Sequence, residues 1–161
     1  MKSTALSDIN LTLYLNIGSN IGDRRSNILR AVALIKRQEW ILPDTMRLSD
    51  FIQSEPWGYE SINTYTNLGV AADIYPEKHP LEILHSIHLI QSQIDPAPHR
   101  DSSGNYIDRI IDIDIIAIDN MVFNHPELII PHPRMHIRPF VLRPMQTIAP
   151  DWVHPILGKL W

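Results

Sequence analysis

The stretch DRIIDIDIIAI, residues 108–118, constrains the fold more than any other segment of the chain. Isoleucine dominates it, and a short run of β-branched residues is typical of a strand buried in a sheet. Residues 80–94, before it, place isoleucine at intervals of four, three and four, which predicts an amphipathic helix packed on that sheet. Residues 65–74 (YTNLGVAADI) predict a strand before the helix. This half of the chain therefore has the order strand, helix, strand.

The residues nearer the N-terminus predict a similar unit. The alternating segment LTLYLNI, residues 11–17, predicts a strand. Asp23 is a suitable N-cap for a helix that should end near Glu39, and RLSDFIQS, residues 47–54, predicts another strand. The complete order β-α-β-β-α-β is that of a ferredoxin-like α+β fold, in which both helices pack on one face of an antiparallel sheet.

Short elements should follow this unit. Residues 121–123 and 127–130 suit brief segments, and residues 139–148 suit a helix. About half of the 13 prolines lie at or beyond Pro126, so we expect the last quarter of the chain to be irregular and rigid.

Composition narrows the classes of protein to consider. The 161 residues suit a single domain, 1–161. A net charge of −4 argues against nucleic acid as a partner. No apolar run reaches the ~18 residues of a membrane span, and the first residues lack an apolar signal segment, so we expect no membrane association. The absence of cysteine excludes disulfides, thiolate zinc sites and a cysteine nucleophile, and fits a cytoplasmic protein.

Asp112 and Asp114 are the first candidate functional residues. Two residues apart on a strand, they should share one face, and two carboxylates there repel each other unless a cation lies between them. Mg²⁺ is the natural cation, since it favours a few carboxylates together with water and phosphate oxygens. The alternative is an ordinary charged strand edge, and this feature alone leaves both interpretations open. Arg109 should face the other way on a regular strand, and can join the pair if the strand begins after it.

The segment PHPRMHIRPF, residues 131–140, is the second candidate. Its prolines should hold His132, Arg134 and Arg138 in fixed directions, which suits a phosphate group. The alternative is a proline-rich surface turn with solvated cations.

An aromatic and amide set is the third candidate. Tyr65 and Asn67 share one strand face, with Trp57 and Tyr59 in the loop before them, and such a set can stack and hydrogen-bond a flat heterocycle. The alternative is a core tyrosine beside a strand asparagine. The polar loop at residues 95–106 has the length of a binding loop or lid.

Six motifs, none specific alone, follow one another along the chain: YLNIGSNIGD (14–23), SEPWG (54–58), YTN (65–67), RIIDID (109–114), PHPR (131–134), and IAPD (148–151) with His154-Pro155. In this order they resemble the 6-hydroxymethyl-7,8-dihydropterin pyrophosphokinase family of folate biosynthesis. The resemblance extends over about residues 11 to 159.

The resemblance implies a ferredoxin-like fold and an ATP-dependent diphosphokinase. It would transfer pyrophosphate from ATP to the hydroxymethyl group of the pterin and release AMP. ATP is then a co-substrate, two Mg²⁺ ions are expected, and the partners are small molecules. We expect a monomer in the cytoplasm.

The resemblance also implies roles for individual residues. The residues expected to act in catalysis are Arg109, Asp112 and Asp114, the two aspartates also as metal ligands. The residues expected to bind the pterin are Gly18, Ser54, Glu55, Trp57, Tyr65, Asn67 and Phe140. The residues expected to bind ATP are His88, Gln91, Arg100, Arg109, Ile115, His132 and Arg138.

The sequence departs from the family pattern before the metal strand. Many members have a Trp-Gly-Pro-Arg run there, whereas this chain reads Tyr106-Ile-Asp-Arg109. We expect Arg100 and Tyr106 to replace the missing cation and tryptophan. The alternative functions are a ferredoxin-like sensor of small molecules without catalysis, which leaves Asp112 and Asp114 without a role, and a different pterin enzyme such as an aldolase.

Overall fold

The computed structural model of the chain describes residues 10–161 except 57–58, 60, 98–99 and 106. Its elements, in chain order, are β1 (Leu11–Ser19), α1 (Arg24–Lys36), β2 (Arg47–Leu48), β3 (Ile52–Ser54), β4 (Tyr65–Ile74), α2 (Pro80–Ile94), β5 (Asp112–Ile118), β6 (Phe123–His125), β7 (Leu128–Ile130), the 3-10 turn η2 (Met135–Ile137) and α3 (Pro139–Ile148). No helix among the described residues combines the length and the apolar character needed to span a membrane.

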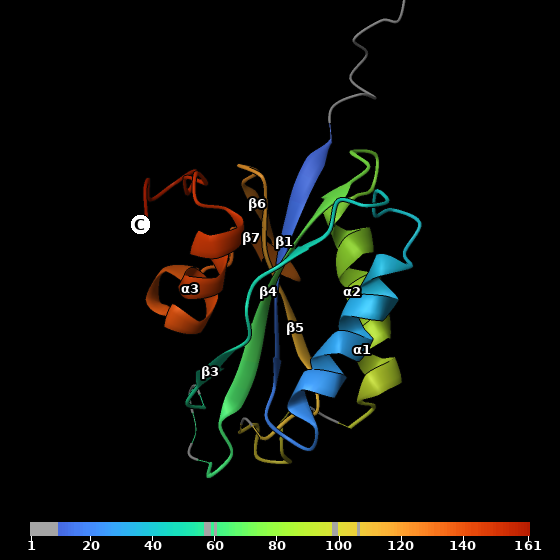
Figure 1. The fold of residues 1–161 in the computed structure, drawn as a ribbon, viewed down its shortest axis with the longest axis vertical. Helices are drawn as coiled ribbons and strands as arrows, with labels where there is room; N and C mark the ends of the chain where they lie inside the picture. The colour runs from blue at the N-terminus through green and yellow to red at the C-terminus, as the bar shows by residue number, and fades with distance from the viewer. Residues whose placement is uncertain (1–9, 57–58, 60, 98–99, 106) are drawn as a thin grey trace, which may run out of the picture.

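The main sheet is antiparallel throughout, with the strand order β2-β4-β1-β5 and with β3 also paired to β4 (Figure 1). β1 therefore lies between β4 and β5, and β6 and β7 form a separate hairpin. The expected strand and helix order is present, and the ferredoxin-like fold is confirmed.

The strand expected at residues 47–54 is two short strands. Arg47 pairs with Ala71, whereas Ile52 pairs with Asn67, so the register on β4 changes by one residue between β2 and β3. Such an extra residue is a β-bulge, which bends a strand locally. After the bulge, β3 pairs with the N-terminal end of β4, residues 65–67, which lies beside the cavity described below.

The strand expected at residues 108–118 begins only at Asp112. The residues before it leave the ladder because Asn20 binds them instead. The backbone N–H of Asn20 donates to the carbonyl oxygen of Arg109 at 3.0 Å, and the N–H of Arg109 donates to Oδ1 of Asn20 at 2.7 Å. Arg109 therefore precedes the strand, and the direction of its side chain does not have to follow the period-two alternation of β5.

The helices agree closely with the sequence-based expectations. The side chain of Asp23 caps α1 by accepting a hydrogen bond from the N–H of Ser26 at 3.1 Å. This helix ends at Lys36, whereas Glu39 was expected, and α2 and α3 have the expected bounds.

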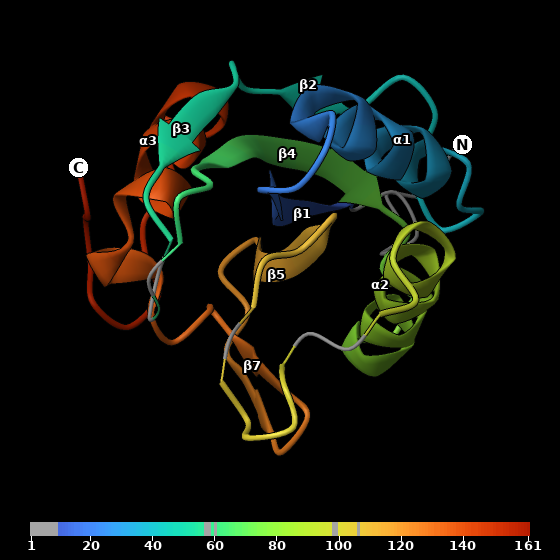
Figure 2. The same ribbon diagram turned by 90° about the horizontal axis from the view of Figure 1, so that it is seen from below.

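Side chains of β1 alternate between two apolar layers. Leu13, Leu15 and Ile17 are buried against α1 and α2, whereas Tyr14 is buried in a second layer with Val141 and other residues of α3. Figure 2 shows α1 and α2 on one face of the sheet and α3 on the other. The expectation that the first two helices share a face is confirmed, and α3 adds a third layer.

The packing of α3 on the sheet is closest at Gly69 of β4. A Cβ atom at this position would lie 2.6 Å from Cβ of Pro144, which belongs to α3. Atoms of this kind cannot approach so closely, and both belong to stiff parts of the chain. Glycine at this position therefore sets the distance between α3 and the sheet.

We predict that Gly69→Ala lowers the free energy of unfolding by about 1–3 kcal/mol, the usual cost of overpacking. Urea unfolding would measure it. Val122→Ala, at a residue that is 58% exposed, is the control and should change the free energy by less than about 0.5 kcal/mol. Equal effects of the two substitutions would contradict close packing at Gly69.

Candidate active site

A cavity of about 320 Å³ lies on the face of the sheet that carries α3. Its base is formed by residues two apart on three adjacent strands: Asn16 and Gly18 of β1, Tyr65 and Asn67 of β4, and Asp112 and Asp114 of β5. These residues lie beside one another across the three strands, because Gly18 pairs with Asn67 on one side and with Asp112 on the other. Period-two alternation then turns all six toward the same face.

Tyr65 and Asn67 form one end of the cavity, close against β1. A Cβ atom on Gly18 would lie 3.1 Å from Oδ1 of Asn67 and 3.3 Å from Cδ1 of Tyr65, so the missing side chain is what admits them. Nδ2 of Asn67 donates to Oγ of Ser54 at 2.7 Å. Burial raises the pKa of the Tyr65 hydroxyl above its usual value, so this hydroxyl is protonated at neutral pH.

Phe140 lines the same cavity from the first turn of α3. Its carbonyl oxygen accepts a hydrogen bond from Nδ2 of Asn16 at 2.9 Å, which ties α3 to β1. The guanidinium carbon of Arg138 lies 5.6 Å from the centroid of the Phe140 ring, within the range of a cation–π contact. The cavity thus has an aromatic ring from each of two facing elements, Tyr65 from the sheet and Phe140 from α3.

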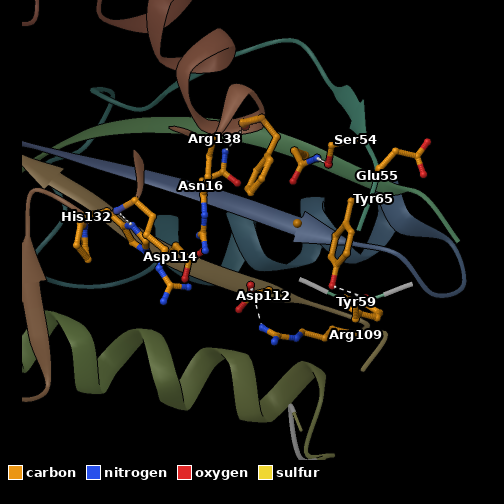
Figure 3. A pocket seen from close by; sticks show the side chains of 15 residues that line it. Asn16, Ser54, Glu55, Tyr59, Tyr65, Arg109, Asp112, Asp114, His132 and Arg138 are labelled. Atoms are coloured by element: carbon orange, nitrogen blue, oxygen red, sulfur yellow. Dashed lines mark hydrogen bonds and ion pairs between the residues drawn. The ribbon is translucent and has the colours of Figure 1, made fainter. Parts of the chain in front are cut away.

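Asp112 and Asp114 lie in the middle of the cavity (Figure 3). Burial is the main reason why the pKa of Asp114 rises to about 7; the charge of Asp112 also raises it, whereas Arg138 and Arg109 act in the opposite direction. Nη1 of Arg109 lies 3.0 Å from Oδ2 of Asp112. Because the strand begins after it, Arg109 can reach the acidic pair despite its odd spacing.

The acidic pair fits Mg²⁺, which binds oxygen ligands and keeps several from water or phosphate. Among the described residues there is no cluster of three or more histidine, aspartate, glutamate or cysteine side chains suited to a metal. This protein therefore offers a partial ligand set, Asp112 and Asp114, of the type that shares the ion with a phosphorylated substrate.

His132, Arg134 and Arg138 also line the cavity, and His132 lies beyond Asp114, on the side away from Tyr65 (Figure 3). The N–H of His132 donates to the carbonyl oxygen of Ile116 at 2.8 Å, which holds the segment on β5. Nδ1 of His132 accepts from the N–H of Arg134 at 3.1 Å, so the proton of the neutral ring is on Nε2. Burial, together with the charges of Arg138 and Arg134, lowers the pKa of His132 to about 4.

Most residues expected from the sequence to act in catalysis or binding line this one cavity: Gly18, Ser54, Glu55, Tyr65, Asn67, Arg109, Asp112, Asp114, His132, Arg138 and Phe140. Arg134 of the phosphate-binding segment and Tyr59 of the aromatic set line it too, whereas Asn16 and Pro133 line it without having been assigned a role from the sequence. Asn16 could have been found, because it lies two residues before Gly18 on the same strand.

Four of the residues expected to bind ATP do not line the cavity. His88 is exposed on α2, and Arg100 is exposed in the loop before β5. Oε1 of Gln91 accepts a hydrogen bond from the backbone of β5, and the side chain of Ile115 is buried in the core against α1 and α2. Their roles toward ATP stay predictions. The expected pterin contact Trp57 and the replacement residue Tyr106 lie outside the described residues.

Comparison with known proteins shows the family to which the chain belongs. Residues 14–150 match the family described as 7,8-dihydro-6-hydroxymethylpterin-pyrophosphokinase (HPPK). The chain belongs to this pyrophosphokinase family. A relative from Porphyromonas gingivalis, named 2-amino-4-hydroxy-6-hydroxymethyldihydropteridine pyrophosphokinase, is 38% identical over 146 residues, which cover 89% of this chain and 93% of the relative. A relative of the same name from Aquifex aeolicus is 32% identical over 92% of this chain and 86% of its own length.

Solved structures agree with the fold. A crystal structure of HPPK-DHPS from Plasmodium falciparum matches 94% of this chain with a TM-score of 0.65 at 15% sequence identity. This chain spans 43% of that longer protein. The expected pyrophosphokinase family is confirmed, and so is an enzyme that transfers pyrophosphate from ATP to hydroxymethyldihydropterin in folate biosynthesis. The alternatives of a non-catalytic sensor and of a different pterin enzyme are therefore set aside.

We predict that His132 makes the stability of the protein depend on pH. The ring is neutral in the folded protein down to a pKa of about 4, whereas in the unfolded chain it takes up a proton near pH 6.5. Between these values the unfolded chain binds more protons, so the free energy of unfolding falls as the pH falls from 6.5 toward 4.

Urea unfolding of the native protein and of His132→Asn, at pH 7 and at pH 5, would measure how much of this loss of stability is due to His132. Asparagine can still accept the hydrogen bond from the N–H of Arg134 but does not titrate. The loss of stability between the two pH values should be smaller in the variant by about 1–2 kcal/mol. The same loss in both proteins would show that His132 is not the group responsible.

Proposed function

We propose that the cavity holds both substrates of the pyrophosphoryl transfer, the pterin at the aromatic end and the phosphates of ATP at the end formed by the cations. One observation carries this proposal. Tyr65, Asp112 and His132 come from separate segments of the chain but line a single cavity, with Asp112 between the other two (Figure 3). A transfer reaction needs this arrangement, because the acceptor and donor groups must meet in line.

In the pterin half, Tyr65 and Phe140 would stack on the two faces of the ring, as aromatic side chains do with flat heterocycles. Asn67 would read the polar edge of the ring, with its amide oriented by Ser54. Gly18 supports this role by leaving space for Tyr65 and Asn67 beside β1. We extend this half to Glu55, which lines the cavity, and to Trp57 on the basis of the family motif.

In the nucleotide half, Arg109, His132 and Arg138 would contact the phosphates. The two arginines carry permanent charge, and His132 presents its Nε2–H as a hydrogen-bond donor. Phosphate oxygens close to His132 would raise its pKa, because a nearby anion favours the charged ring. We keep His88, Gln91, Arg100 and Ile115 as outer contacts of the nucleotide, on the basis of the family resemblance.

Catalysis in this cavity would consist mainly of positioning and charge neutralisation. The bond that forms joins the hydroxymethyl oxygen to the β-phosphorus of ATP, and the bond that breaks links this phosphorus to the oxygen that leaves with AMP. Asp112 and Asp114 would hold Mg²⁺, which supplies positive charge to the phosphate oxygens. Arg109 and Arg138 would stabilise the charge that develops on the transferred group. Asp114 is our candidate to accept the hydroxymethyl proton, because its carboxylate lines the cavity in which the two substrates would meet.

We further propose a single domain, 1–161, that acts as a cytoplasmic monomer with two Mg²⁺ ions. One continuous sheet joins the two halves of the chain, which supports the single domain. Residues from one chain supply both ends of the cavity, which supports the monomer. The absence of cysteine supports the cytoplasm. The number of ions rests on the family resemblance.

The assay of this proposal incubates the protein with ATP, Mg²⁺ and hydroxymethyl-dihydropterin and follows the release of AMP. We predict that Asp112→Ala and Asp114→Ala each lower kcat by at least about 100-fold, the usual loss for one group that stabilises transition-state charge. Glu77→Ala is the control, since its exposed carboxylate lies between β4 and α2 and outside the cavity. Full AMP release by the Asp112→Ala and Asp114→Ala variants would refute the assignment of the acidic pair.

Tyr65→Ala tests the division into two halves. Loss of stacking should weaken pterin binding by about 1–3 kcal/mol, by analogy with bases stacked on aromatic side chains, while ATP affinity stays the same. Equilibrium binding of each ligand alone, followed by calorimetry, would measure both. Equal losses for the two ligands would contradict the assignment.

A further inference from the structure

A cluster of polar residues lies at the edge of the cavity and is not explained by the contacts proposed above. Asp108 is at its centre and accepts four hydrogen bonds, two on each carboxylate oxygen. Oδ1 accepts from Nδ2 of Asn20 at 2.8 Å and from the hydroxyl of Tyr59 at 2.9 Å. Oδ2 accepts from Oγ of Ser61 and from Nδ2 of Asn63, each at 2.9 Å. We call these five residues the Asp108 cluster.

The Asp108 cluster joins three segments that are far apart in the sequence. Asn20 follows β1, Asp108 precedes β5, and the other three members belong to the segment between β3 and β4. The side chain of Asn20 is 99% buried, given an exposed fraction of 1%, and its Nδ2 also lies 3.0 Å from the hydroxyl of Tyr59. Asp108 is therefore the common acceptor that keeps the segment before β4 against the base of the cavity.

The cluster is connected to the pterin end of the cavity through two tyrosines. The hydroxyls of Tyr59 and Tyr65 lie 3.1 Å apart. A phenol has one hydrogen, and that of Tyr59 is directed to Asp108, so Tyr65 must be the donor of the pair. The hydrogen bonds therefore run in one direction, from Tyr65 to Tyr59 to the carboxylate of Asp108. Figure 3 shows Tyr59 and Tyr65 meeting at this end of the cavity.

The cluster requires an ionised carboxylate at its centre. Burial acts to raise the pKa of Asp108, but the hydrogen bonds from Ser61, Asn20, Tyr59 and Asn63 outweigh it, and the pKa lies below its usual value. A carboxylate can accept at both oxygens, which no other side chain of this size does. Alanine at position 108 would leave all four donors without this acceptor.

We propose that Asp108 is a positioning residue for the pterin: its carboxylate fixes Tyr59, and through Tyr59 the ring of Tyr65, in the orientation that receives the substrate. This inference rests on the proposed role of Tyr65 in pterin binding. The ATP end should be less affected, because Asn20 also holds the backbone of Arg109 through two hydrogen bonds that do not involve the Asp108 side chain.

The test is a double-mutant cycle on pterin affinity with Asp108→Ala, Tyr59→Phe and the double variant. Equilibrium binding of hydroxymethyl-dihydropterin, and separately of ATP, would be measured for each protein. We expect each single variant to bind the pterin about tenfold more weakly, the loss typical of a hydrogen bond to a charged group. We expect the double variant to be about as weak as the weaker single variant, because both substitutions break the same chain of hydrogen bonds. ATP affinity should change less than about twofold.

Two further variants keep the result interpretable. Asp108→Asn should recover part of the affinity, because its amide oxygen can still accept from Asn20 and Tyr59; if Asp108→Ala does not fold, the cycle is run with Asp108→Asn instead. Asp101→Ala is the matched control. The carboxylate of Asp101 accepts hydrogen bonds from the N–H groups of Ser103 and Asn105 in the neighbouring loop, and its loss should leave pterin affinity unchanged.

The outcomes separate this inference from the proposed function. If the losses in the two single variants multiply in the double variant, or if Asp108→Ala binds the pterin like the native protein, the role of Asp108 is refuted. If Tyr65→Ala itself leaves pterin affinity unchanged, the assignment of the pterin half is wrong, and the role of Asp108 in pterin binding is wrong with it. Weak binding by Tyr65→Ala together with multiplying losses would overturn the inference about Asp108 alone.

Discussion

The active site depends on how α3 packs on the second face of the sheet. On the three adjacent strands β4, β1 and β5, the residues of this face change from apolar to polar side by side. The apolar positions, which α3 covers, are Tyr14 of β1, Ala71 of β4 and Ile116 of β5. Closer to the cavity the same strands carry short or polar side chains. Only the first turn of α3, through Phe140, reaches this part of the face. The cavity therefore lies where α3 begins, and Gly69 fixes how far α3 approaches the sheet.

The elements that could be predicted from the sequence are those with regular periodicity. The isoleucine spacing of residues 80–94 and the strand pattern of residues 65–74 predicted α2 and β4 with their bounds. The spacing of Asp112 and Asp114 predicted that both lie on one face, and the cavity contains both. These predictions succeed because alternation and helical period determine which way a side chain points, whatever the tertiary contacts are.

Features that depend on contacts between distant segments could not be predicted in this way. Arg109 reaches Asp112 because Asn20 draws the preceding residues out of the sheet, and nothing local to residue 109 indicates this. The Asp108 cluster joins three segments, so its members look like ordinary loop polar residues in the sequence. The cover provided by α3 was also missed. Val141, Met145 and Ile148 mark its apolar face, but helical periodicity does not indicate which face of the sheet a helix packs on.

Charge in the cavity is balanced by the protein itself. Arg109 pairs with Asp112, and His132 stays neutral next to two arginines. The arginine side chains of the cavity are permanently charged, but the aspartates offset them. Positive charge is therefore not in excess, and a metal ion can bind. A phosphate ligand and a divalent cation can then enter together, each compensating the other, in a chain whose net charge is −4.

The hydrogen bonds on the outer side of β5 have a consequence for solubility. β5 is the last strand of the main sheet, and an open strand edge is a template on which other chains can add strands and aggregate. Gln91 accepts from the N–H of Ile113, and the N–H of His132 donates to the carbonyl oxygen of Ile116, so both a donor and an acceptor of this edge are already engaged. At the opposite edge, β2 and β3 are short and separated by a bulge. Gln91 of α2 and His132 of the cavity thus help to keep the sheet from growing into a fibre.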